Sequence, residues 1–366
     1  MTERDPNQTG LHARQVEETG PSASIRCGLF VLAGHDGLTD AVAAGFAESG
    51  CAVHLLSPAS EPPFPRCDFL ATYGPMQSMA PAVARLRQLA SPSTPVFVWF
   101  TEQVPWPSSP RALVYPIAKL RYFLDRICYA QLVPARVRQR CFVATLLRRA
   151  GRFRALGEML ALKQYGVLRL IGAFSETNVR FLWRHGLPAT NIPMGYHQAF
   201  GERLGLDRDI DVVFLGSTRD QRRRRVIAQL EEQLTEKGVR TVVKDGSLER
   251  GSAFDRDRTI LLNRSRIMLN VMRQPWDDLV FRLLLAAPNG AMLLSERLLP
   301  TSTGPFTPDA HFAVADLPNM VDAVRFYLAE DRERQRIVER AYSFVTETLT
   351  MGRMASAAVR ALGFHD

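Results

Sequence analysis

Glycine and arginine follow one apolar run in a pattern that suits a phosphate ligand. Residues 209–217 read DIDVVFLGS, in which Gly216 ends the apolar run, and Arg219, Arg222 and Arg223 accompany the start of the next helical segment. A glycine lets a phosphate approach the backbone, a helix N-terminus favours anions, and arginine adds bidentate hydrogen bonds to diphosphate oxygens. These residues predict a diphosphate site, with a solvated arginine face as the alternative.

A second group of candidates lies in the helical segment 277–290 and the strand after it. Arg282 interrupts the apolar run VFRLLLAA, where a buried cation needs an anionic partner. That partner is either a phosphate or a structural carboxylate. The turn after this segment and the end of the following strand supply the other candidate ligand contacts: Asn289, Gly290, Ser295 and Glu296. A glutamate at a strand end can accept hydroxyl hydrogen bonds from a ribose or a sugar, or it can form a plain salt bridge.

Histidine and carboxylate side chains also follow apolar runs in the first half of the chain. Gly34, His35 and Asp36 come directly after the first run, and Glu102 ends the run PVFVWFTE. Histidine acts as a general base near neutral pH, and Glu102 is another candidate because it is a carboxylate at a strand end. His197 lies in a polar segment between the two halves, where it could contact either ligand. A loop residue without further role is the alternative for each.

No metal site is expected. The DID sequence at 209–211 imitates a metal-binding D-x-D motif, but it precedes an apolar run instead of following one, so we interpret it as the entry to a strand. The five cysteines all lie in the first half without C-x-x-C spacing, which indicates reduced structural thiols.

The elements that must position these residues alternate between strand and helix. Apolar runs ending in glycine alternate with segments of helical periodicity from about residue 24, and the pattern restarts near residue 209. This alternation predicts an α/β protein with two Rossmann-like, doubly wound domains that face a cleft. Ligands bind beyond the carboxyl ends of the strands in such sheets. A Rossmann oxidoreductase is disfavoured because the first loop reads GHDGLTDA and lacks G-x-G-x-x-G.

Composition limits the class of protein and its partners. The chain has 366 residues, 46% hydrophobic and 23% charged, and no apolar run long enough to span a membrane. We therefore expect a cytoplasmic protein. Its net charge is +9, and only four of its 46 basic residues are lysines. Such arginine-rich basicity suits an anionic ligand such as a nucleoside diphosphate, or peripheral contact with an anionic membrane. No nucleic-acid-binding motif is present.

The second half resembles a known family. Several segments carry the likeness in family order: DIDVVFLGS, LNRSRIMLNVMR, FRLLLAAPNGAMLLSE, GPFTPDAHFAVAD and RQRIVERAYSFV. They are similar to the C-terminal domain of GT-B-type glycosyltransferases, specifically the spore-maturation-protein-like family. Residues 1–23, which are polar and mixed in charge, are predicted to be a disordered tail. For the rest, the resemblance implies an acceptor-side domain (24–200), a nucleotide-sugar-binding domain (201–345) and a C-terminal helix that crosses back to the first domain (346–366).

The resemblance also implies roles for particular residues. Retaining GT-B enzymes often carry glutamates thirteen and five residues before a glycine that corresponds to Gly290; here these positions hold Asp277 and Leu285. Asp277 thus joins His35 and Glu102 as a catalytic candidate, and Arg282 matches an arginine of the family.

The implied activity is metal-independent sugar transfer from a nucleotide-diphosphate sugar, a co-substrate, to a small-molecule, glycan or glycolipid acceptor, with no cofactor and no nucleic acid. Because Leu285 replaces the second glutamate, a catalytically inactive GT-B-like nucleotide- or sugar-binding protein is the alternative.

Overall fold

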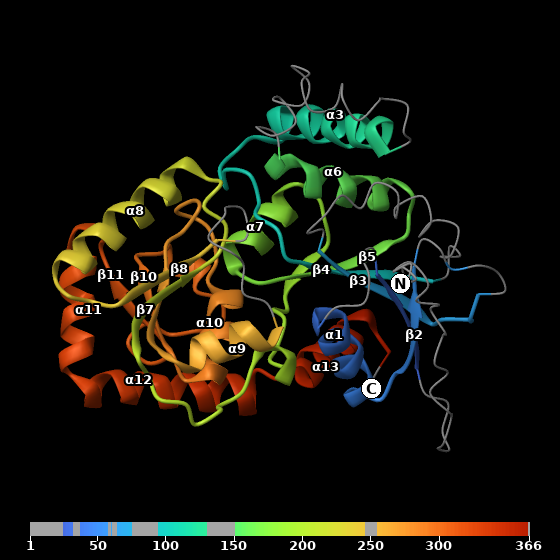
Figure 1. Cartoon of the computed structure of the whole chain (residues 1–366). Helices are drawn as coiled ribbons and strands as arrows, with labels where there is room; N and C mark the ends of the chain where they lie inside the picture. The colour runs from blue at the N-terminus through green and yellow to red at the C-terminus, as the bar shows by residue number, and fades with distance from the viewer. Residues whose placement is uncertain are drawn as a thin grey trace, which may run out of the picture.

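The computed structural model describes residues 25–31, 37–57, 60, 64–74, 94–129, 151–245 and 255–364. These residues form two lobes, each built on a parallel sheet (Figure 1). The strands of the first sheet are β1 (Arg26–Phe30), β2 (Ala52–Leu56), β3 (Phe69–Gly74), β4 (Val96–Phe100), β5 (Leu168–Ala173) and β6 (Ala189–Asn191). Those of the second are β7 (Ile210–Leu215), β8 (Thr241–Lys244), β9 (Ser265–Asn270), β10 (Met292–Glu296) and β11 (Ala313–Ala315).

Both sheets follow the same winding. The first has the order β2-β1-β3-β4-β5-β6 and the second β11-β10-β9-β7-β8, so in each the opening strand lies between the second and third strands of its own lobe. In both lobes the winding therefore reverses beside the opening strand, and this switch point opens a crevice beyond the carboxyl ends of the strands. The α/β class with two doubly wound sheets is confirmed.

Helices cover both faces of the first sheet. These helices are α1 (Gly37–Glu48), α3 (Arg111–Tyr129), α6 (Gly151–Gln164) and α7 (Glu176–Arg184). The alternation of side chains along β4 explains the two layers. Phe97 and Trp99 enter a core shared with α1, whereas Val96, Val98 and Phe100 enter a second core with α3 and α6.

The second sheet is likewise covered on both faces. Its helices are α8 (Gln221–Glu236), α9 (Asp255–Asn263), α10 (Val280–Ala286), α11 (Met320–Ala329) and α12 (Asp331–Ser343). Short 3-10 turns complete the connections: η1 (Gln198–Phe200), η2 (Ala287–Asn289), η3 (Pro300–Ser302) and η4 (Leu317–Asn319). No helix among the described residues is long and apolar enough to cross a membrane.

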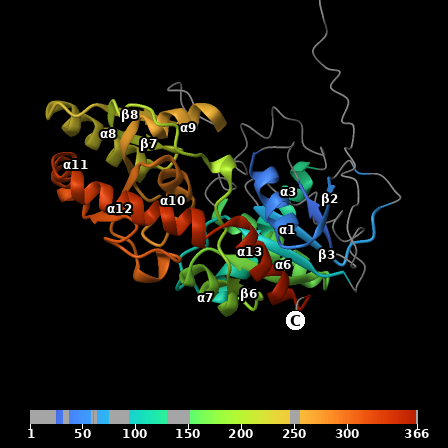
Figure 2. The same ribbon diagram turned by 90° about the horizontal axis from the view of Figure 1, so that it is seen from below.

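The chain passes between the lobes twice, and the two crossings are hydrogen-bonded to each other. After a π-helical turn, η5 (Phe344–Thr348), the chain reaches the last helix, α13 (Met351–Leu362). The Tyr196 N–H donates to the Leu349 carbonyl (2.6 Å), and the Met351 N–H donates to the Tyr196 carbonyl (2.7 Å). Helix α13 lies beside α1 of the first lobe in both views (Figures 1 and 2), where Met351 packs on Gly45.

Candidate functional site

The loop after β7 lies at the switch point of the second sheet. Gly216 has φ of 147°, a value that favours glycine, and a β-carbon there would collide with the Arg282 guanidinium. The Thr218 N–H donates to the buried Asp245 carboxylate at 2.9 Å, and the Asp220 side chain caps α8. The loop is therefore fixed at both ends with its backbone against Arg282. Arg219 is exposed beside it.

Arg282 is a mostly buried cation without an ion partner. It sits in the first turn of α10, and its guanidinium lies over the Phe214 ring at 5.6 Å. None of the residues that the structure describes forms a hydrogen bond or ion pair with it. Burial, together with Arg223 and Arg273 nearby, lowers the pKa of Arg282 to about 9, so the side chain stays charged at neutral pH. Asp277 is the described carboxylate that favours the charged form of Arg282, but it forms its ion pairs with Arg223 and Arg273 and not with Arg282.

Asp277 joins two further arginines next to Arg282. It accepts a hydrogen bond from Arg273 at 3.2 Å and lies 4.0 Å from Arg223. Arg223 is only 4% exposed, donates to the Ser217 carbonyl, and lies over the same Phe214 ring at 6.0 Å. Burial lowers the pKa of Arg223 to about 10. One carboxylate thus faces two arginines, and the neighbourhood keeps an excess of positive charge.

Arg222 and Glu296 form a bidentate ion pair at the same edge. Their two N–O distances are 3.0 and 2.5 Å, and the Met272 N–H donates to the same carboxylate. Ser295 is fully buried and bonds to Asn270 at 2.9 Å. This arrangement favours the salt-bridge interpretation of Glu296. A contact between Glu296 and a sugar or ribose hydroxyl would share that carboxylate with Arg222.

Across the interface, the loop after β4 brings first-lobe groups to the second lobe. The Trp276 Nε1–H donates to the Val104 carbonyl at 3.1 Å, and the Trp106 ring meets the Trp276 ring edge-on at 4.5 Å between centroids. Glu102 is partly buried, and no described residue lies within hydrogen-bond or ion-pair distance of it. Burial raises the pKa of Glu102, while Arg273 and Arg154 oppose that rise.

Two predicted donor contacts lie elsewhere, and we correct them. Asn289 and Gly290 precede β10, at the amino ends of the strands, whereas Gly216 and Glu296 lie at the carboxyl ends. The Asn289 amide donates to the Phe200 and Leu285 carbonyls and accepts from Asn263. Its side chain therefore holds the inter-lobe segment. The reason is that α10 and η2 return the chain to the opposite edge of the sheet.

The remaining predicted residues divide into two sets. His197 caps η1 by accepting from the Ala199 N–H at 3.1 Å, a structural role. Gly34, His35 and Asp36 lie outside the described residues.

Sequence reasoning missed Arg273 and Trp276, which join the two lobes. Their signal was weak because they occur in the short segment MRQPWDD, between the elements that were interpreted. Aspartates 209 and 211 form ion pairs with Arg264 and Arg266 at the start of strands, as expected of strand-entry residues. Among the described residues, no group of three or more metal-ligating side chains comes together.

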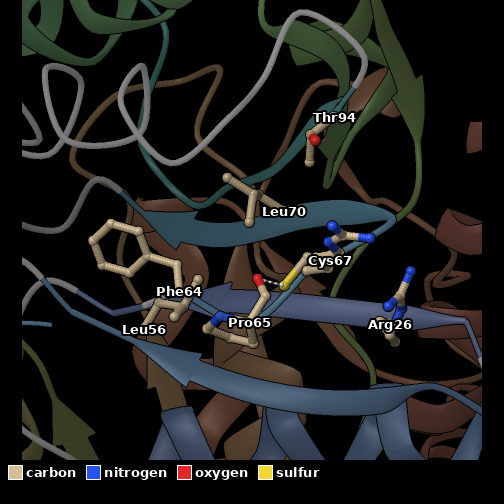
Figure 3. A pocket seen from close by; sticks show the side chains of 8 residues that line it. Arg26, Leu56, Phe64, Pro65, Cys67, Leu70 and Thr94 are labelled. Atoms are coloured by element: carbon tan, nitrogen blue, oxygen red, sulfur yellow. Dashed lines mark hydrogen bonds between the residues drawn. The ribbon is translucent and has the colours of Figure 1, made fainter. Parts of the chain in front are cut away.

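A separate pocket opens in the first lobe, away from these residues (Figure 3). Leu56, Phe64, Cys67 and Leu70 contribute to its wall. Burial raises the pKa of Cys67 to about 11, so the thiol is not a nucleophile at neutral pH. Arg26 at its rim is paired with Asp68. None of the described residues that line this pocket supplies a reactive nucleophile or base.

Comparison with known proteins gives the fold a name. Residues 220–359 match the model of a family described as "Glycosyl transferase-like". The T4 phage BGT, solved with its UDP-glucose substrate, is 12% identical and superposes with a TM-score of 0.54 over 92% of this chain and 99% of its own. WaaG, a glycosyltransferase involved in lipopolysaccharide biosynthesis, is 13% identical and superposes with a TM-score of 0.52 over 93% of this chain and 100% of its own.

HepE from Anabaena, solved with UDP and glucose, is 11% identical and superposes with a TM-score of 0.50 over 92% of this chain and 99% of its own. No curated protein sequence matches the chain. The fold is that of the GT-B glycosyltransferases, while the narrower spore-maturation-protein-like family stays a prediction.

Proposed function

We propose that this protein transfers a sugar from a nucleoside-diphosphate sugar to an acceptor hydroxyl without a divalent metal. The observation that carries the proposal is Arg282, a mostly buried guanidinium that forms no hydrogen bond or ion pair with any described residue and is held against the glycine turn at the switch point. Burying a charge is costly unless an anion accompanies it. A diphosphate supplies that anion, and the family match and the GT-B fold make a sugar nucleotide its natural form.

The chemistry assigned to the site is electrostatic. In transfer, the bond between the anomeric carbon and the β-phosphate oxygen breaks, and the acceptor oxygen forms a new bond to that carbon. The leaving diphosphate gains negative charge, which Arg282 and Arg223 are placed to stabilise in the role that a metal ion takes elsewhere.

Glu102 is the candidate to receive the acceptor proton. A base must be free of strong partners and have a pKa nearer to the working pH than an ordinary carboxylate. Glu102 meets both conditions, with its pKa raised by burial, whereas Asp277 is engaged by two arginines. His35 stays a candidate from the sequence alone.

The first experiment measures donor binding. Calorimetry of the full chain with UDP, GDP, dTDP and ADP in EDTA should show one nucleotide binding with micromolar or better affinity, unchanged by added Mg²⁺. Bound at a concentration of 100 Kd, it should stabilise the fold by about 2.7 kcal/mol. Absence of binding by all four, with and without Mg²⁺, would contradict the proposal. Binding only with Mg²⁺ would contradict metal independence.

A binding protein without catalysis is the second candidate. Leu285 favours it, because this partly buried side chain packs into the apolar core where the resembling enzymes carry a glutamate. Slow hydrolysis of the bound sugar nucleotide separates the two candidates. Release of free sugar by the wild-type chain, lost in Glu102→Gln, supports the enzyme; tight binding with no release under any condition supports the binding protein.

We also propose peripheral contact with an anionic membrane through α3. Its outer surface carries Leu113, Leu120 and Phe123, which are 55%, 53% and 59% exposed, beside the exposed cations Lys119 and Arg126. An apolar stripe flanked by cations is typical of helices that lie on anionic lipid. The chain should sediment with phosphatidylglycerol-containing vesicles more than with phosphatidylcholine alone, and Leu120→Ser/Phe123→Ser should reduce the difference. Equal sedimentation with both would contradict the contact.

A further inference from the structure

A small pocket lies at the amino edge of the second sheet, the opposite edge from the one that carries Arg282. Its volume is about 210 Å³. Two of its lining residues, Arg208 and Asn263, each stand two positions before a strand, β7 and β9 respectively. Helix α12 and the segment after η1 supply further lining residues: Gln335, Glu339, Arg203 and Leu206. We call this cavity the amino-edge pocket.

Arg208 is a half-buried cation that forms no ion pair with any described carboxylate. Its guanidinium donates to the carbonyls of Leu262 (3.3 Å), Ser265 and Asn289 (2.9 Å), and these bonds fix its position. Burial and three neighbouring arginines lower the pKa of Arg208 to about 10, while Glu339 opposes that fall. The side chain therefore stays charged at neutral pH, and positive charge is in excess around it.

Three side chains of the pocket have hydrogen-bond donors to offer a ligand. A guanidinium has five N–H donors, of which Arg208 uses three on carbonyls. Gln335 is half-buried on α12, and its amide forms no hydrogen bond with a described residue. Arg203 lies over the Tyr342 ring at 3.9 Å and pairs with Glu339 at 2.9 Å. Because that ion pair is exposed it contributes little stability, so Arg203 can turn to a ligand at small cost.

The amino-edge pocket lies between the two passages of chain that join the lobes. Residues 203–208 continue the first passage, and α12 leads through η5 into the second. Asn263 fastens the first passage by donating to the Glu202 carbonyl (2.8 Å) and accepting from the Leu204 N–H (2.7 Å). A ligand bound to Arg203 and Gln335 together would therefore bridge the two passages.

We propose that the amino-edge pocket binds a phosphate group, either free or as the monoester of a small molecule, through Arg203, Arg208 and Gln335. Arginine forks match phosphate oxygens, and several donors converging on one cavity suit an anion with several acceptor oxygens. Leu206 and Val338 add apolar surface for a few carbon atoms of an ester. The pocket lies at the opposite edge of the sheet from the Arg282 group, so the inference does not depend on the proposed function.

The experiment is calorimetry on the full chain carrying Arg282→Met, which removes the phosphate-binding guanidinium assigned to the other edge. The probes, at constant ionic strength, are inorganic phosphate, glycerol 3-phosphate and acetate. At least one phosphate should bind with millimolar or better affinity, and acetate at least tenfold more weakly. Tighter binding of glycerol 3-phosphate identifies an ester as the occupant, and equal binding identifies free phosphate. Gln335→Glu, which adds a negative charge to the pocket, should weaken the phosphate at least tenfold, and Arg203→Gln at least threefold.

Each variant has a control with the same change of charge. Gln229→Glu is exposed on α8, which contributes no described residue to the pocket wall, and Arg180→Gln removes an exposed arginine that also pairs with a glutamate. Both controls should leave phosphate binding unchanged. The inference is overturned if neither phosphate binds, if acetate binds as tightly as both, or if Gln335→Glu binds phosphate as tightly as Gln229→Glu.

Hydrogen exchange on the wild-type chain locates the ligand without relying on any variant. Glycerol 3-phosphate or inorganic phosphate should slow amide exchange in residues 203–208 and 335–339. Slower exchange confined to residues 216–223 would place the phosphate at the carboxyl edge and overturn the inference. Nucleotide binding at that edge is measured separately, so failure of this inference and failure of the proposed function are distinguishable.

Discussion

The carboxyl edges of the two sheets share one strand order and carry opposite chemistry. At the second edge, three arginines pair with Asp277 and Glu296, and a fourth, Arg282, forms no ion pair with a described residue. At the first edge, the loop after β4 offers a carboxylate, two unpartnered polar groups and an indole. The same winding thus positions a cluster of arginines in one lobe, and a partly buried carboxylate and an exposed indole in the other. The difference in side-chain chemistry lies in the loops, since the strands of both sheets only determine where these loops begin.

The largest effect should follow from removing the unpaired cation of the second edge. Arg282→Met should lower affinity for the nucleoside diphosphate by roughly 10- to 100-fold, since a charge-assisted hydrogen bond is worth about 1.5–3 kcal/mol. Binding of the bare nucleoside should change little. Calorimetry with both ligands measures the contrast, and Arg225→Met, an exposed arginine of α8, serves as the control.

Stability gives an independent readout for the same variant. Because Arg282 has no described ion partner, its replacement should leave the free energy of unfolding of the apo protein unchanged or raise it. A variant that loses several kcal/mol of stability would show that Arg282 stabilises the fold. It would contradict the assignment of Arg282 to anion binding at the second edge.

The next effect concerns Glu102 at the first edge. Transfer or sugar-nucleotide hydrolysis should fall as pH drops through the raised pKa of this carboxyl, because only the ionised form accepts a proton. Glu102→Gln should remove that limb of the pH–rate profile. An identical limb in the variant would assign the titration to another group.

The effect of Glu102→Gln on the free energy of unfolding also has a definite sign. The folded-state pKa of Glu102 lies above its unfolded value. At pH values between the two, the folded state binds more protons than the unfolded state, so the protein loses stability as the pH rises through this range. Glu102→Gln should therefore be more stable than wild type at pH 7 and not at pH 3. Denaturant titrations at the two pH values measure this directly.

The smallest effect should come from the ion pair that closes the second edge. Glu296→Gln leaves Arg222 and the Met272 N–H with a weaker acceptor and should cost about 1–3 kcal/mol of stability. Arg297→Gln, at the exposed pair with Asp316, should cost less than about 1 kcal/mol. If Glu296→Gln instead weakens nucleotide binding strongly while leaving stability unchanged, Glu296 binds ligand and the salt-bridge interpretation is wrong.

Local patterns predicted the architecture well, and distances within the site poorly. Apolar runs such as FVWF and VVFL are buried on both faces, and this is why they were readable as strands. Strand β6 had no readable signal because its three residues, between Pro188 and Pro193, give too short a pattern. Asn289 and Gly290 follow Arg282 closely in sequence, yet the helical residues of α10 and η2 between Arg282 and Asn289 carry the chain roughly 10 Å toward the other edge.

Contacts between the lobes had no local signal at all. Arg222 and Glu296 lie 74 positions apart in the sequence, so local patterns cannot show that they form an ion pair. The contact between Trp106 and Trp276 depends on how the two lobes pack against each other. Residue type indicated that buried arginines need anions, but only the packing shows which of them already have one.

The docking of α13 on α1 bears on how the protein is made. The last helix covers the helix that follows the first strand, and Phe364 stacks on Phe69 of β3 at 5.4 Å. The two surfaces lie about 300 residues apart in the chain, so at ~5–20 residues per second a ribosome needs ~15–60 s to supply the missing cover. Until then, the surface of α1 on which Met351 packs remains uncovered. Synthesis of the first lobe therefore begins first, but its packing is completed only after the last helix has been made.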